Sequence, residues 1–153
     1  MKPIRRILVA TDFSACANAA AKVAAPLARQ FKAQVHVLTV IDTAWITDAS
    51  GTAAWRRLSI DEFQHAARKR LRAFADRHFG RLKESHIHVC DGEGLDPPKP
   101  SVEVLRVAKR LGCDLIVLGT HGRTAMEHLL LGSVAEKTVR ASTIPVLTVR
   151  SRS

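Results

Sequence analysis

The sequence has no tyrosine and few other aromatic residues, which make up 5% of its 153 residues. Hydrophobic residues nevertheless amount to 46% of the chain. A core built from this chain must therefore consist mainly of alanine, valine, leucine and isoleucine side chains. A chain of this length holds enough apolar residues for one core and no more. We expect a single domain over residues 1–153.

Cysteine is also scarce. The three cysteines, Cys16, Cys90 and Cys113, lie far apart in the chain and form no C-x-x-C pair. An odd number of scattered thiols does not make a disulfide framework, and the seven histidines do not combine with them at zinc-finger spacing. We expect free thiols in a reducing compartment and no metal site formed by protein side chains.

Long hydrophobic runs are absent. The first apolar run, Ile7 to Ala10, is followed closely by Asp12 and is too short for the core of a signal peptide. No stretch approaches the roughly 18 apolar residues that a membrane-spanning helix needs. We expect a soluble, cytoplasmic protein without a membrane partner.

Acidic residues are outnumbered, with 14 Asp and Glu against 24 Lys and Arg, which gives a formal net charge of +10. Many of the basic residues fall within or beside a helix predicted over residues 59–80. Such a run could contact the phosphates of a nucleic acid. It is more often the solvated face of a helix. Nucleic-acid association through this helix therefore stays an alternative and is not our main hypothesis.

Strands and helices alternate along the chain. Short β-branched or aliphatic runs predict strands, and apolar residues at helical spacing predict helices between them. The expected strands cover residues 4–10, 34–40, 86–90, 114–119 and 145–150. This alternation predicts an α/β fold with an open parallel sheet and helices on both of its faces. Two long connections, 41–58 and the Gly- and Pro-rich 91–100, are expected to be loops.

Serine marks the start of each predicted helix. The expected first residues or caps are Ser14, Ser59, Ser101 and Ser133. Two of them, Ser59 and Ser133, are followed three residues later by glutamate, which is the pattern of a capping box. Pro26 falls inside the first helix, where we expect a kink or a break because proline costs about 3 kcal/mol relative to alanine there.

Polar and glycine residues follow the predicted strands at the places where open α/β sheets bind ligands. Thr11 and Asp12 follow the first strand, Val40 ends the second, and a stretch that begins at Gly119 follows the fourth. If the first and fourth strands are neighbours at the reversal of strand order, Asp12 faces Gly119 across a crevice.

The connection from Gly119 to Ser133 is the most informative segment. Glycine occurs at both of its ends, and the amides at the start of the following helix are unpaired donors that favour an anion. Plain turn and cap residues would look similar on composition alone. Neither a Walker-type loop, G-x-x-x-x-G-K-[ST], nor a G-x-G-x-x-G after the first strand is present. The spacing therefore leaves two interpretations, a phosphate site and an ordinary turn.

Gly119-x-x-Gly122, nine residues and then Gly132-Ser133 resembles the ATP-binding signature of the universal stress proteins, G-x2-G-x9-G-[ST]. The segments ILVATDFS, DLIVLGTHG, LLLGSVAEKTVR and IPVLTVR are similar to that family in the same order, and they span nearly the whole chain. The link GLDPPKP before the third helix is longer than the short G-x-P link of relatives.

The resemblance implies a five-stranded parallel sheet of order 3-2-1-4-5 and a homodimer formed through the last strand, 145–150. It implies that Asp12 and the strand end at Val40 hold the adenosine of ATP and that the glycine loop lines the phosphates. Magnesium would arrive on the nucleotide's own oxygens. The implied contact set is Ala10, Thr11, Asp12, Val40, Gly119, Thr120, His121, Gly122, Arg123, Gly132, Ser133 and Val134.

The function implied by the resemblance is that of an ATP-binding regulator or signalling protein of the stress response. Two alternatives stay open. One is a slow ATP hydrolase that uses the same pocket, and the other is a nucleic-acid-associated protein that uses the basic helix. Asp12 is the one acid identified at the predicted crevice, and no second acid cluster accompanies it. A fast enzyme is therefore the less favoured interpretation.

Overall fold

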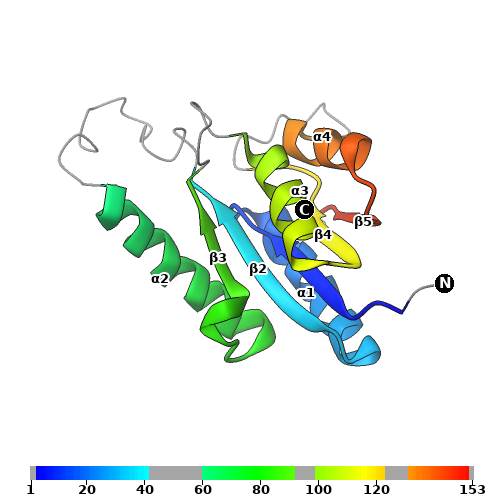
Figure 1. The fold of residues 1–153 in the computed structure, drawn as a ribbon, viewed down its shortest axis with the longest axis horizontal. Coiled ribbons are helices and arrows are strands. Elements are labelled where there is room, and N and C mark those ends of the chain that lie inside the picture. Colours follow the sequence, from blue (N-terminus) through cyan, green and yellow to red (C-terminus); the bar gives the residue numbers. More distant parts are fainter. Residues whose placement is uncertain (1–2, 42–59, 92–98, 123–130, 152–153) are drawn as a thin grey trace.

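The computed structural model describes residues 3–41, 60–91, 99–122 and 131–151. Within them, strands and helices alternate (Figure 1). In chain order, they are β1 (Arg6–Ala10), α1 (Ala15–Phe31), β2 (Gln34–Val40), α2 (Ile60–Phe79), the short 3₁₀ helix η3 (Glu84–His86), β3 (Ile87–Cys90), α3 (Pro100–Leu111), β4 (Leu115–Gly119), α4 (Ser133–Ala141) and β5 (Val146–Val149).

The strands form one parallel sheet with the order β3-β2-β1-β4-β5. The chain begins in the middle of this sheet, since β1 pairs with both β2 and β4. Strand order therefore reverses between β1 and β4, and their carboxyl ends flank the crevice where α/β sheets bind ligands. The predicted fold class and strand order are confirmed.

Two apolar cores lie on opposite faces of the sheet. One is formed with alanines of α1 and with Leu71, Phe74 and Ala75 of α2. The other is formed with Val104 and Val107 of α3 and with residues of α4. Alanine supplies much of the first core because α1 buries seven residues, of which six are alanine and one is cysteine. Small side chains let this helix lie close to the sheet. A core with few large aromatic side chains needs such a close approach to be well packed.

The helix starts differ in part from the prediction. Ser14 caps α1 as expected, with its Oγ accepting the amide of Ala17 at 3.2 Å. The cap of α3 is Lys99 and not Ser101, because Pro100 has no N–H to lose and fits the first helical position. The cap of α4 is Gly132, so Ser133 is its first helical residue. The predicted cap Ser59 lies outside the described residues.

Pro26 does not break α1, which continues as one α-helix from Ala15 to Phe31. Of the kink or break predicted there, the break is wrong and the kink stays a prediction. Proline at this exposed position removes one backbone donor, but the helix on either side is held to the sheet by its buried alanines. Packing therefore outweighs the local cost. None of the helices in the described part of the chain is long and apolar enough to cross a membrane.

Candidate functional site

The turn after β1 forms one side of the candidate site. The Thr11 amide donates to the carbonyl of Leu38 at 2.8 Å, which continues the pairing of β1 with β2. Thr11 Oγ1 accepts the amide of Phe13 at 2.9 Å, and Asp12 Oδ1 accepts the amide of Ser14 at 3.0 Å. Thr11 is buried, and Asp12 is partly exposed at the carboxyl end of β1. These bonds fix the Asp12 carboxylate at the mouth of the crevice.

Phe13 holds this turn in a conformation that few non-glycine residues adopt. Its φ is 63°, in the left-handed region. Its ring packs edge-on against Phe74 with centroids 5.9 Å apart, and the guanidinium of Arg70 lies 4.5 Å from its centroid. Contacts from α2 therefore hold a strained residue beside Asp12, and strain of this kind is often found at functional sites. No sequence pattern pointed to Phe13.

The exit of β4 forms the other side. Ser14 Oγ donates to the carbonyl of His121 at 3.4 Å, so the two turns are joined across the crevice. Thr120 Oγ1 lies 3.0 Å from His121 Nδ1. The Gly132 amide donates to the Thr120 carbonyl at 2.7 Å, which brings the start of α4 back to the end of β4. The two ends of the predicted glycine loop therefore meet.

The three glycines have different neighbours. A Cβ at Gly122 would lie 2.8 Å from Asp12 Oδ2, and a Cβ at Gly132 would lie 3.0 Å from the Thr120 carbonyl oxygen. These two glycines line the crevice. A Cβ at Gly119 would instead lie 2.7 Å from backbone and side-chain atoms of Cys16. Asp12 thus faces Gly122, and the expectation that it faces Gly119 is wrong. Gly119 lets α1 approach β4.

Positive φ is not the reason for glycine at this site. Among the described glycines, only Gly80 and Gly112 have a positive φ. Gly132 has φ −71° and ψ 158°, an extended conformation open to any residue. The glycines of the candidate site are needed for close approach, which leaves backbone atoms exposed to whatever lies in the crevice.

The first turn of α4 begins beside the end of β4, because the Gly132 amide is bonded to the Thr120 carbonyl. Gly132 has no side chain, so no side-chain oxygen caps this helix. The amides of a first helical turn have no partner within the helix, and the helix dipole adds partial positive charge there. Ser133 is exposed beside them. This end of α4 can therefore donate hydrogen bonds to an anion.

The remaining predicted residues are placed as follows. The Val40 side chain is 8% exposed and packs in the core with Cys90, so only the end of its strand borders the crevice. Ala10 and Val134 are partly buried against the same core. Arg123 lies outside the described residues. The structure thus brings together the ends of β1 and β4 and the start of α4.

Two residues that the sequence reasoning missed lie behind Gly119. Cys16 Sγ is 3.3 Å from Ser151 Oγ and accepts the Ser151 amide at 3.5 Å. Burial raises the pKa of the Cys16 thiol, but hydrogen bonds with Ser151, His121 and Thr120 outweigh it, so this pKa lies below its ordinary value. The segment after β5 is thereby tied to the first turn of α1. No sequence pattern links residues so far apart.

No three His, Cys, Asp or Glu side chains gather as metal ligands within the described ranges. A family model agrees with this architecture: the model of the universal stress protein family matches residues 3–150. The chain belongs to the universal stress protein family. Universal stress protein MJ0531 of Methanocaldococcus jannaschii is 30% identical over 148 residues, which cover 95% of this chain and 82% of that relative.

Solved members of the universal stress protein family share the fold. The structure of protein MJ0577, also from Methanocaldococcus jannaschii, matches with a TM-score of 0.71 and 26% identity and covers 99% of each chain. A universal stress protein from Archaeoglobus fulgidus, solved in complex with dAMP, matches with a TM-score of 0.61 over 97% of this chain and 99% of that chain. Its identity to this chain is 17%, so this likeness concerns the fold alone.

Proposed function

We propose that this universal stress protein binds ATP between the ends of β1 and β4 and the start of α4, and that it acts as a stress-linked regulator. The observation that carries the proposal is the pair of close approaches at Gly122 and Gly132. Each glycine lies where a Cβ would press on Asp12 or on the Thr120 carbonyl. Two such positions beside an uncapped helix start are better explained by a bound phosphate chain than by an ordinary turn.

The phosphates would be held mainly by backbone amides. The first turn of α4 supplies donors and a favourable dipole, and Ser133 adds an exposed hydroxyl. The adenosine would lie toward β2, where the Asp12 carboxylate and the strand end at Val40 border the same crevice. Arg123 and the neighbouring His121 complete the proposed contacts. Magnesium would come with the nucleotide, carried on its phosphates.

A regulator fits this site better than a fast hydrolase. Among the described residues of the site, Asp12 is the one carboxylate, and its Oδ1 already accepts the Ser14 amide. A hydrolase needs a positioned base and water, for which a cap-like carboxylate is poorly placed. We expect ATP turnover below about 1 per second, under the usual range of enzymes. A faster rate that Asp12→Asn abolishes would favour the hydrolase.

Further proposals concern the molecule as a whole. We propose that residues 1–153 form one domain, that the protein acts in the cytoplasm, and that it is a homodimer. The dAMP in the Archaeoglobus fulgidus structure belongs to that protein, so the case for a nucleotide here depends on this chain's own residues. Nucleic-acid binding through the basic helix stays the alternative. Salt-resistant, sequence-selective binding to DNA or RNA would favour it, since phosphate contacts alone weaken steeply with salt.

The first experiment is mass spectrometry of the denatured purified protein, which should detect retained adenine nucleotide. Calorimetric titration of the protein with ATP then tests the site. We expect a dissociation constant in the micromolar range, or about 8 kcal/mol of binding free energy. Gly122→Val and Gly132→Val place a branched side chain in the crevice, and each should weaken ATP binding at least about 100-fold. Circular dichroism must show that both variants are folded. Unchanged ATP affinity in a folded Gly132→Val variant would refute the proposed function.

A further inference from the structure

Three histidines gather at the amino end of the sheet, opposite the proposed nucleotide site. The register pairs Leu8 with His36 and Leu38 with His88. Because side chains alternate between faces along a strand, His36 and His88 lie on the same face as Leu8 and Leu38. His86 precedes β3 and falls beside His36 in the continuation of this register. We call these three residues the histidine cluster.

The rings of the histidine cluster are in contact. His36 Nδ1 lies 3.1 Å from His88 Nε2, so one ring donates a hydrogen bond to the other. The ring centroids of His36 and His86 are 4.3 Å apart, and those of His36 and His88 are 5.3 Å apart. His36 is 6% exposed, whereas His86 and His88 are partly exposed. The cluster thus has one buried member and two members that solvent can reach.

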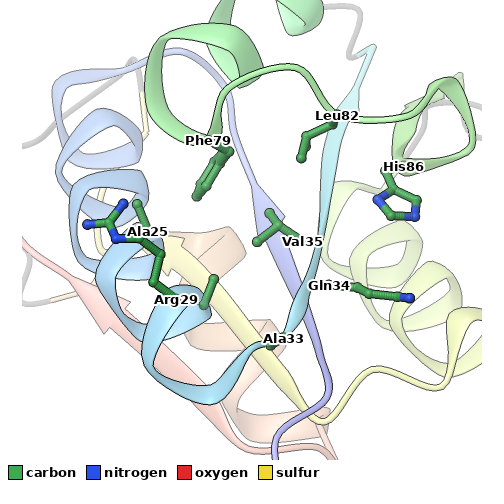
Figure 2. Close-up of a pocket in the computed structure, with 9 residues that line it drawn as sticks. Ala25, Arg29, Ala33, Gln34, Val35, Phe79, Leu82 and His86 are labelled. Carbon is green, nitrogen blue, oxygen red and sulfur yellow. The ribbon is translucent and has the colours of Figure 1, made fainter.

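Among the helices that the structure describes, none lies over β3 on the side of α3. In Figure 1, α3 crosses in front of the sheet, while β3 has no helix in front of it. The hollow of about 360 Å³ between α1, α2 and β2 lies on the other face (Figure 2). Gln34 and His86 are among the residues that line that hollow, so His86 borders both the hollow and the cluster. Because His86 and His88 are partly exposed, a ligand can reach the cluster through these two rings.

Positive charge from several elements acts on the cluster. The pKa of His36 is lowered to about 4, mainly by burial and then by the charges of His86, His88 and Arg6 of β1. The pKa of His88 is also lowered to about 4, mainly by burial and then by the charges of Arg110 of α3, His86 and Arg68 of α2. Burial and Lys83 lower the pKa of His86, against a backbone hydrogen bond with Val35. The imidazoles are therefore neutral at neutral pH, within a positive field.

The acidic groups of this region are engaged elsewhere. Glu84 forms ion pairs with Arg68 and Arg72. Asp114 accepts the backbone amides of Arg5 and Arg6 at 2.9 and 3.0 Å. Neither carboxylate is among the groups that shift the pKa of the three histidines. The charge of Arg68 is therefore balanced by Glu84, whereas neither carboxylate acts on the histidines themselves.

A cation is poorly matched to this environment. Two imidazole nitrogens 3.1 Å apart could approach one transition-metal ion, but no third ligand joins them in the described part of the chain. Arg6, Lys83, Arg68 and Arg110 would also repel a divalent cation. An anion gains from the same charges, and imidazole and guanidinium groups donate hydrogen bonds to it.

We propose that the histidine cluster and Arg110 form a binding site for a doubly charged oxyanion, a phosphate group, at the amino end of β2 and β3. His86 and His88 would donate to the anion, Arg110 would neutralise it from α3, and His36 would hold His88 through their shared hydrogen bond. This site lies at the opposite end of the strands from the proposed nucleotide site. Its test is therefore independent of the proposed function.

Anion binding at this site must be coupled to protonation. A bound dianion stabilises the imidazolium form, so the histidines take up protons when it binds. By linkage, affinity must then rise as the pH falls. Sulfate is a suitable probe, because its own charge does not change near neutral pH. We expect sulfate to bind at least about fivefold more tightly near pH 5.5 than near pH 7.5, a change of roughly 1 kcal/mol.

The test is a sulfate titration followed by the histidine side-chain signals in NMR spectra. Sulfate should shift the signals of His86 and His88, and Arg110→Gln should weaken its binding at least about threefold. Lys109→Gln is the matched control, since it removes the same charge from the next exposed residue of α3 and should leave the affinity unchanged. His88→Gln should reduce the pH dependence, since His86 still takes up a proton. Arg110→Gln and Lys109→Gln change exposed residues of α3 and keep the buried His36, so we expect both variants to fold.

The source of the phosphate group is decided with ATP present in saturating amount to fill the proposed nucleotide site. Tripolyphosphate and a short single-stranded RNA are titrated separately. Tighter binding of tripolyphosphate per phosphate identifies a small ligand, and tighter binding of the RNA identifies a polymeric one. Sulfate-independent histidine signals at both pH values would overturn the proposal. Equal losses in Arg110→Gln and Lys109→Gln would also overturn it, as would Zn²⁺ binding to the cluster more tightly than any of the anions.

Discussion

At the scale of single residues, the glycine spacing predicted where the chain comes close to itself, but not which atoms it approaches. Gly119, Gly122 and Gly132 share one signature, yet they face Cys16, Asp12 and the Thr120 carbonyl respectively. A signature records which positions must be small. The neighbour that requires the small residue belongs to another element. Its identity depends on how the elements pack, which the spacing of glycines along the chain does not show.

Gly119 should be needed for folding more than for ligand binding. Alanine there would place its Cβ 2.7 Å from the backbone carbon of Cys16 and 2.9 Å from the Ala17 amide nitrogen, so α1 would have to move. We expect Gly119→Ala to lower the free energy of unfolding by about 1–3 kcal/mol, the usual cost of overpacking. Urea denaturation measures it. Gly122→Ala is the control, because its Cβ would meet only side-chain atoms of Asp12 and no backbone atom of a helix. Equal stabilities of the two variants would contradict this assignment.

At the scale of elements, the positions of helices and strands followed the apolar pattern, while helix starts followed local chemistry. The predicted strand over residues 34–40 is β2 itself. Ser14 was a correct cap, whereas Pro100 and Gly132 moved the starts of α3 and α4 by a residue or more. Serine is a good cap and also an ordinary first-turn residue. Composition alone could not separate these two roles.

Ser133 should therefore affect ligand binding without affecting α4. It is the first helical residue and exposed, and Gly132 occupies the cap position. Ser133→Ala removes one hydroxyl and places a stronger helix former in the first turn, so the melting temperature should be unchanged or slightly higher. ATP binding should weaken about fivefold, or by about 1 kcal/mol, the value of one hydrogen bond. Thermal melts and calorimetry on the same samples decide it. A clear drop in melting temperature would restore Ser133 as the cap.

At the scale of the whole molecule, alternation of strands and helices was enough to predict the sheet and its covered faces. It did not predict which part of a face stays uncovered. His36 and His88 lie in strands whose other residues are mostly apolar, so the strand pattern alone predicts that both are buried. The relative positions of α3 and β3 decide that His88 is partly exposed while His36 is buried. The tie between Cys16 and Ser151, across most of the chain, could not be predicted for the same reason.

The buried histidines should make the fold sensitive to acid. His36 and His88 have a pKa of about 4 in the folded protein and about 6.5 when unfolded. Between these pKa values the unfolded chain binds more protons than the folded protein. The contribution of the two neutral histidines to the free energy of unfolding is therefore fully present above about pH 6.5 and is lost as the pH falls toward 4. Urea denaturation at a series of pH values should show this slope. His88→Gln should reduce it, and His65→Gln, on the exposed side of α2, should not. An unchanged slope in His88→Gln would exclude the cluster as its cause.

The edge of the sheet at β5 should form a homodimer. Ile116 of β4 and Thr120, which follows β4, donate to the carbonyls of Pro145 and Val149. Backbone groups of alternate residues point to opposite sides of a strand, so those of Val146 and Thr148 face away from β4. An edge with apolar side chains and open backbone groups favours pairing with a second copy.

Thr148→Pro removes one outward N–H without removing a bond to β4, and proline is tolerated in edge strands. We expect light scattering to give a dimer for the parent and for the control Thr148→Ala, which keeps the N–H, and a dimer at least about tenfold weaker for Thr148→Pro. A parent that stays monomeric at micromolar concentration would refute pairing through this edge. So would a folded Thr148→Pro variant that dimerises as well as the control, because the contact would then have to use another surface.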